Sequence, residues 1–161
     1  MSEGRRMGEG PSRPGSDSTF CLEVSPDPDQ VRTARLFAAA VARHFGADEN
    51  RVEDLKVAIS EAATNSIKAH RGAGVSEPIR ISADSEADGI RFTVRDAGDG
   101  FPIGPGPEFR DSVTPVPGLF EGSLGLTLIR SLFPDVEITA NEDRGMNVSF
   151  VLEVPRKNGS D

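Results

Sequence analysis

Two polar side chains on one predicted helix, Glu61 and Asn65, could do chemistry together. Apolar residues recur every three or four positions over residues 50–70, which predicts an amphipathic helix with these two side chains one turn apart on one face. The Asn65 carboxamide offers a neutral oxygen to a hard metal cation, and the Glu61 carboxylate can position or deprotonate an attacking hydroxyl. The alternative is an ordinary solvated helix face. The pair alone therefore does not identify a site, and other features of the sequence must support one.

A second candidate, Asp96, follows a predicted strand. Ile90, Phe92 and Val94 alternate with polar residues, and the same parity places Asp96 on the buried face of the sheet. A buried carboxylate must find hydrogen-bond donors, and an exocyclic amine is one of them, which would select adenine over guanine. Gly98 and Gly100 lack side chains, so the backbone there can approach a flat base. The alternative is an aspartate that caps the next turn.

A third feature, Gly122-Ser123-Leu124-Gly125-Leu126, opens a predicted helix. It follows a segment rich in Gly and Pro, residues 97–121, whose length is typical of a lid or binding loop. Free N–H groups and the helix dipole at such a start attract phosphate groups. The three features together, in this order, predict a nucleotide site. The chain has no P-loop motif and no protein-kinase glycine-loop set.

The order of predicted elements is strand, helix, helix, hairpin, long loop, helix, hairpin. This order predicts an α+β fold: a two-layer sandwich with a mixed, mostly antiparallel sheet of about five strands and helices on one face. We expect one domain over residues 19–155, a disordered tail over 1–18 and a polar tail over 156–161.

Charge and composition narrow the class of protein. The net charge of −8 argues against general binding to nucleic acid or to an anionic membrane. The single cysteine, Cys21, excludes an intrachain disulfide framework, and His44 and His70 lack companions at metal-ligand spacing. No run approaches the roughly 18 apolar residues of a membrane span, and no apolar segment follows Arg5 and Arg6 as a secretory signal requires. We therefore expect a cytoplasmic protein.

The three features resemble a known family. E-A-A-T-N, D-A-G-D-G and G-S-L-G-L are similar to the N box and the two glycine boxes of the GHKL ATPases, which have the histidine-kinase-like ATP-binding fold. Within that superfamily, the segment from Leu55 to His70, the S-P-D-P-D-Q-V-R-T-A-R segment before it and the small size most resemble the bacterial anti-sigma-factor serine/threonine kinases. The resemblance covers residues 19–155.

This resemblance implies a function and a set of roles. Asn65 would coordinate Mg²⁺, Glu61 would act as general base toward a serine or threonine of a protein substrate, and Asp96 would bind the adenine amine of ATP. The family further implies a homodimer that binds a sigma factor and phosphorylates an anti-anti-sigma antagonist. The nucleotide pocket would be shaped by glycines and their neighbours: Gly98, Gly100, Gly122, Ser123, Leu124, Gly125 and Leu126.

The chain departs from the family pattern at two places. Gly145-Met146 stands where relatives often have Gly-Thr, which predicts weaker adenine binding, and His70-Arg71-Gly72 replaces a more usual His-Ala-Tyr. Two other functions remain open. One is a non-catalytic module that binds nucleotide and only sequesters partners, which the presence of Glu61 disfavours. The other is a fragment of a sensor histidine kinase with His44 or His70 as phosphoacceptor, which the lack of a dimerisation helix pair disfavours.

Overall fold

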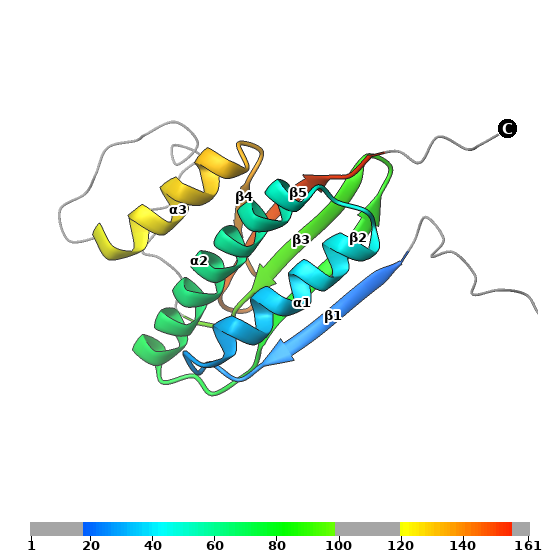
Figure 1. Ribbon diagram of the computed structural model, residues 1–161. Coiled ribbons are helices and arrows are strands. Elements are labelled where there is room, and N and C mark those ends of the chain that lie inside the picture. The colour runs from blue at the N-terminus through cyan, green and yellow to red at the C-terminus, as the bar shows by residue number, and fades with distance from the viewer. Residues whose placement is uncertain (1–17, 99–119, 156–161) are drawn as a thin grey trace, which may run out of the picture.

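The computed structural model describes residues 18–98 and 120–155, with the side chains of 120–124 left aside. Three helices and five strands follow one another along this part of the chain (Figure 1). In chain order they are β1 (Thr19–Val24), α1 (Gln30–His44), α2 (Glu49–Ala73), β2 (Ile79–Glu86), β3 (Gly89–Arg95), α3 (Phe120–Leu132), β4 (Glu137–Ala140) and β5 (Met146–Glu153).

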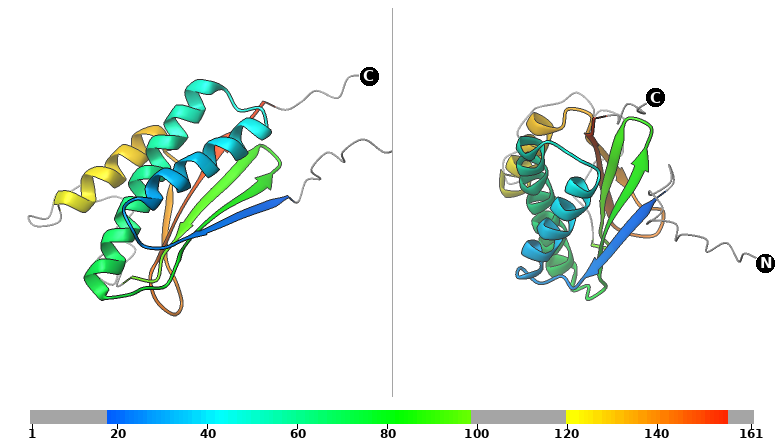
Figure 2. Two further views of the ribbon diagram at one scale, coloured as in Figure 1. Left: turned by 60° about the horizontal axis from the view of Figure 1, so that its bottom comes forward. Right: turned by 45° about the vertical axis from the view of Figure 1, so that its right-hand side comes forward.

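The strands form one sheet in the order β1-β2-β3-β5-β4, and every pairing between them is antiparallel. All three helices lie on one face of this sheet (Figure 2). The predicted two-layer α+β sandwich is therefore confirmed, with five wholly antiparallel strands. The predicted tails and most of the predicted loop 97–121 lie outside the described residues. Among the described helices, none has the length and apolar character that a membrane span requires.

The core forms between the helices and the inner face of the sheet, because alternate strand residues point the same way. Phe92 of β3 and Phe150 of β5 are fully buried there, with ring centroids 6.3 Å apart. Phe133, just after α3, lies 4.5 Å from the Phe150 ring. The same parity continues past the end of β3 to Asp96, which is buried as the sequence predicted.

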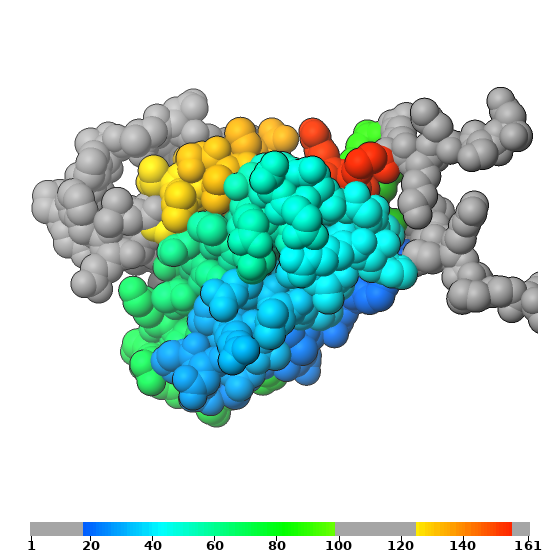
Figure 3. All heavy atoms as spheres, viewed as in Figure 1, coloured from blue at the N-terminus to red at the C-terminus, as the bar shows by residue number. Residues whose placement is uncertain are grey.

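Helix α2 is the centre of the helical layer, with α1 along one side and α3 along the other (Figure 3). Asp48 caps its start by accepting a hydrogen bond of 2.9 Å from the Asn50 N–H. Gly74 ends it in the left-handed conformation, with φ of 65°. Its buried stripe includes Leu55, Ile59 and Ala62, so the helix is anchored along its whole length. This helix is the predicted one, extended by one residue at the start and three at the end.

Helix α3 begins at Phe120, two residues before the predicted start at Gly122. The G-S-L-G segment therefore lies within the first two turns of the helix. Gly122 and Ser123 are still among the first four residues, whose N–H groups have no partner within a helix.

We expect the α2 core contacts to dominate stability. Leu55→Ala removes a fully buried side chain and should lower the free energy of unfolding by about 2–5 kcal/mol. The matched control is Leu36→Ala on α1, where the side chain is 54% exposed and the change should be within about 0.5 kcal/mol. Urea unfolding followed by circular dichroism suits a chain without Trp or Tyr. Similar losses for the two variants would contradict this assignment of the core.

Candidate nucleotide-binding site

The Asp96 carboxylate is buried, with 7% of the residue exposed, and donors from three segments surround it. Its Oδ1 atom accepts hydrogen bonds of 3.1 Å from the backbone N–H groups of Gly98 and Met146. Its Oδ2 atom accepts one of 3.1 Å from the Ser66 hydroxyl on α2. Each carboxylate oxygen has two lone pairs, so Oδ2 retains the capacity to accept from a ligand amine. The carboxylate can therefore accept a hydrogen bond from an amine in addition to these three.

Two glycines allow the backbone around Asp96 to pack closely. Gly145 has φ of 92°, and a Cβ placed on it would lie 2.0 Å from the Asp96 carbonyl oxygen. A Cβ on Gly98 would lie 2.7 Å from the Ala69 Cβ of α2. The segment after β3 is thus pressed between the last turns of α2 and the β4–β5 turn. Gly98, a predicted site residue, lies beside Asp96, while Gly100 lies outside the described residues.

Glu61 and Asn65 lie on α2 where α3 crosses closest. Gly125 of α3 is buried there, and a Cβ on it would lie 2.7 Å from Glu61 Oε2 and 3.3 Å from Asn65 Nδ2. Glycine is therefore what lets the two helices approach at this level. The predicted stacking of Glu61 and Asn65 on one face is confirmed, since both side chains face the same point on α3.

Farther along the pair of helices, Arg51 fixes the direction of α3. Its Nη1 atom donates to the Leu132 carbonyl at 3.3 Å, and its guanidinium lies 4.7 Å from the Phe133 ring centroid. The C-terminal end of α3 therefore meets the beginning of α2, and the helices run antiparallel. This arrangement places the beginning of α3 beside Glu61 and Asn65.

The side chains near Gly125 fit a magnesium ion that is shared with phosphates. Glu61 and Asn65 are oxygen donors and are both half-buried, and the Asn65 Nδ2 atom is buried with no hydrogen-bond partner in the described part of the chain. Residues 18–98 and 120–155 contain no cluster of three or more acidic, His or Cys side chains that could hold a metal alone. Mg²⁺ commonly takes one or two protein ligands and completes its shell with phosphate oxygens and water.

The remaining predicted pocket residues are on α3. Leu126 is half-buried and packs against the hydrophobic core. The backbones of Gly122, Ser123 and Leu124 lie in the first two turns of α3, and their side chains are outside the described residues. The contribution of these residues to phosphate binding stays a prediction.

The sequence did not reveal three partners of the Asp96 segment: Ser66, Asn141 and His70. None of the three sequence features includes Ser66 or Asn141, and the sequence offered His70 only as a disfavoured phosphoacceptor. His70 is fully buried. The structure also changes the interpretation of Met146, which departs from the family pattern. Its backbone N–H donates to Asp96, and the Met146 side chain takes no part in this bond. Weaker adenine binding stays a prediction.

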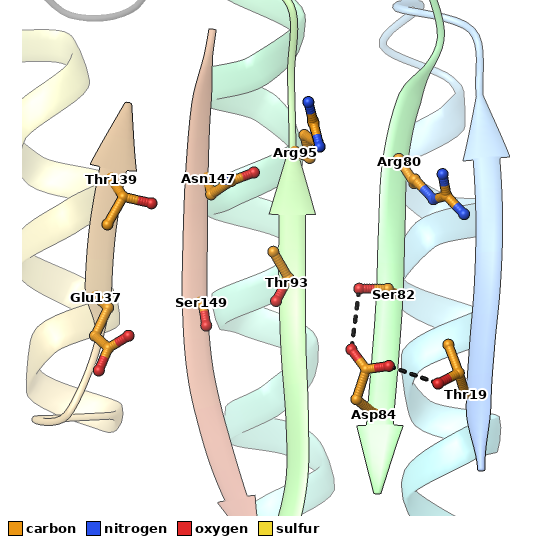
Figure 4. A pocket seen from close by; sticks show the side chains of 10 residues that line it. All are labelled: Thr19, Arg80, Ser82, Asp84, Thr93, Arg95, Glu137, Thr139, Asn147 and Ser149. Atoms are coloured by element: carbon orange, nitrogen blue, oxygen red, sulfur yellow. Dashed lines mark hydrogen bonds between the residues drawn. The ribbon is translucent and has the colours of Figure 1, made fainter. Parts of the chain in front are cut away.

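A shallow hollow of about 470 Å³ lies on the opposite face of the sheet (Figure 4). Polar side chains from all five strands line it, and two of its hydrogen bonds connect Asp84 with Thr19 at 2.8 Å and with Ser82 at 3.4 Å. None of the predicted site residues lines this hollow. The candidate chemistry therefore belongs to the helical side of the sheet.

Residues 24–152 match the family model of the histidine kinase-like ATPase domain. The chain therefore belongs to the histidine kinase-like ATPases, and the predicted superfamily is confirmed.

Particular relatives within this family are serine-protein kinases. The chain is 35% identical over 122 residues to the serine-protein kinase RsbW of Oceanobacillus iheyensis, covering 73% of this chain and 76% of the relative. It is 31% identical over 144 residues to RsbW of Staphylococcus aureus strain MRSA252, covering 84% of this chain and 87% of the relative. These relatives confirm the resemblance to serine kinases.

The fold has a solved counterpart. The crystal structure of the RsbU and RsbW domains of Rv1364c from Mycobacterium tuberculosis matches with a TM-score of 0.59 and 18% identity. The match covers 84% of this chain and 32% of that chain. At this identity the likeness supports the fold alone.

Gly145 gives a direct test of the geometry around Asp96. Gly145→Ala should lower the free energy of unfolding by about 1–2 kcal/mol or more, because the new Cβ meets fixed backbone and φ is positive. The control is Gly72→Ala near the end of α2, where nothing lies within 4 Å of a new Cβ. That change should stabilise the protein by about 0.5–1 kcal/mol. Urea unfolding measures both, and a Gly145→Ala variant as stable as the wild type would refute the close approach.

Proposed function

We propose that this protein is an ATP-dependent serine/threonine-protein kinase that transfers the γ-phosphate of ATP to a partner protein. The observation that carries the proposal is the meeting of Glu61, Asn65 and Gly125 on the same helical layer that holds the Asp96 carboxylate. Helix α2 thereby carries Glu61 and Asn65 at the phosphate end of the proposed site. Its Ser66 hydroxyl also donates to Asp96 at the adenine end. The family and the serine-protein kinase relatives support the same activity.

Recognition of ATP begins with Asp96. Its Oδ2 atom would accept a hydrogen bond from the exocyclic amine of adenine, beside the bond that it already receives from Ser66. Gly98 lets the adjacent backbone lie against Ala69 of α2, which holds the segment that carries Asp96 close to that helix. Guanine carries a carbonyl oxygen at that position, which the carboxylate would repel, so the site should prefer adenine nucleotides.

Asn65 and Glu61 would act at the other end of the nucleotide. The Asn65 carboxamide oxygen would hold Mg²⁺, which neutralises charge on the phosphate oxygens when it is bound. Glu61 would take the proton of the substrate hydroxyl as that oxygen attacks the γ-phosphorus, and ADP would leave with the electrons of the broken P–O bond. The beginning of α3 beside these residues would add N–H groups and a positive dipole end.

The biological setting that we propose follows from the resemblance to anti-sigma-factor kinases. The protein would act in the cytoplasm as a homodimer, bind a sigma factor and release it when an anti-anti-sigma antagonist competes. It would phosphorylate that antagonist on a serine or threonine. The net charge of −8 favours protein partners of this kind over nucleic acid.

The kinase is tested by transfer of labelled phosphate from ATP to candidate antagonist domains encoded in the same genome. We expect Glu61→Gln to slow transfer by roughly 10²–10⁴-fold, because the general base is lost, while ADP affinity stays near that of the wild type. The matched control is Glu53→Gln on the same helix, where the carboxylate pairs with Lys56 at 2.9 Å at the surface. Transfer by Glu53→Gln should be unchanged.

The result also separates the two candidate functions. If wild-type protein binds Mg–ADP but transfers no phosphate to any candidate, the non-catalytic sequestering module is correct. If Glu61→Gln transfers at the wild-type rate, Glu61 is not the base.

A further inference from the structure

We propose that His70 is a positioning residue for adenine recognition, acting as a neutral hydrogen-bond acceptor that fixes the peptide group between Asp96 and Ala97. This inference rests on the proposed nucleotide binding, because it concerns the segment that carries Asp96. Neither motif resemblance nor sequence spacing assigns His70 this role.

The peptide group that joins Asp96 to Ala97 is held at both ends. Its N–H, on Ala97, donates to His70 Nε2 at 2.8 Å. Its carbonyl oxygen, on Asp96, accepts from Asn141 Nδ2 at 2.9 Å. Rotation of this peptide plane would break both bonds at once, so α2 and the β4–β5 turn together fix its orientation. The adjoining Asp96 N–H donates to the Met146 carbonyl at 3.0 Å, which fixes the other side of the residue.

The burial of His70 indicates that its acceptor atom is the reason for its presence. The residue is completely buried. An Nε2 atom that accepts a hydrogen bond requires, in a neutral ring, that Nδ1 carries the hydrogen. The Nδ1 atom is buried and has no hydrogen-bond partner within residues 18–98 and 120–155. An unpaired N–H is unfavourable in a protein interior, so a purely space-filling residue here would be better apolar. The bond to Ala97 is what an apolar residue could not replace.

The consequence for function is that one helix, α2, would set the positions of the groups that bind both ends of the nucleotide. Asn65, Ser66 and His70 lie within two turns of α2: Asn65 is the residue proposed to hold Mg²⁺, Ser66 donates to the Asp96 carboxylate, and His70 accepts from the Ala97 N–H. Because a helix rises by about 1.5 Å per residue, the distance along α2 between the residues at the phosphate end and those at the adenine end is fixed. Loss of the His70 bond would leave this peptide group held by Asn141 alone, and the Asp96 carboxylate would be less firmly oriented toward the base.

The first test needs no nucleotide. Nitrogen-15 NMR of the labelled wild-type protein at pH 8 reports which ring nitrogen carries the hydrogen, and His44, which is exposed, serves as the internal reference. We expect His70 to be in the Nδ1–H tautomer with an unprotonated Nε2. A His70 resonance with the hydrogen on Nε2 would overturn the proposal, because that atom could not accept from Ala97.

The second test measures Mg–ADP affinity by titration calorimetry. His70→Gln keeps an acceptor near the Nε2 position and should bind ADP nearly as well as the wild type. His70→Leu leaves the Ala97 N–H unpaired and should bind roughly 5- to 150-fold more weakly. The control, His44→Leu, should not change affinity. Wild-type affinity in the Leu variant, or equal weakening in the Gln and Leu variants, would overturn the role of the acceptor.

The design separates this inference from the proposed function. If the wild type itself fails to bind Mg–ADP, the proposed function is wrong. The tautomer of His70 in the wild type then still tests the hydrogen bond from the Ala97 N–H. If the His70→Leu variant does not fold, two results still test the proposal: the tautomer of His70 in the wild type and the ADP affinity of the His70→Gln variant.

Discussion

The structure depends on one buried negative charge. The Asp96 carboxylate is inside the protein, and within the described part of the chain no cation pairs with it. A charge in that position is costly unless hydrogen bonds replace the lost water. Gly98, Met146 and Ser66 supply those bonds from the loop after β3, from β5 and from α2. Sheet and helical layer therefore meet at this carboxylate, and its position is fixed by both.

The same constraint explains why the close approaches lie where they do. Gly145 lets the β4–β5 turn press against the Asp96 carbonyl, and Gly98 lets the loop lie against α2. Gly125 does the same for the contact between α3 and the Glu61–Asn65 face. Gly145 brings backbone to Asp96, Gly98 brings it to Ala69 of α2, and Gly125 brings it to the polar side chains of Glu61 and Asn65. The result is a helix whose one side faces the apolar core and which carries, in order, the proposed base Glu61, the proposed metal ligand Asn65, and Ser66 and His70, which contact the Asp96 segment.

Much of this arrangement could be predicted from the sequence, because it follows from local patterns. Alternation in β3 placed Asp96 on the buried face, and helical spacing placed Glu61 and Asn65 together. The contacts of Ser66 and His70 could not be predicted in the same way, since their partners lie 30 and 27 residues away along the chain. The bond from Asn141 to the Asp96 carbonyl joins residues 45 positions apart, so local patterns do not predict it either. The start of α3 was misplaced by two residues, because Phe120 and Glu121 were grouped with the segment rich in Gly and Pro that precedes them.

The central claim is that Asp96 recognises the amine of adenine, and the most direct measurement compares ADP with inosine diphosphate by calorimetry in the presence of Mg²⁺. Inosine carries a carbonyl oxygen where adenine carries the amine, so it would face the Asp96 carboxylate with a second acceptor. The account predicts that ADP binds at least about tenfold more tightly than inosine diphosphate. It also predicts that Asp96→Asn, which keeps an oxygen for the backbone donors and gains an N–H₂ group, removes the preference. Equal affinities of the wild-type protein for the two nucleotides would contradict the account.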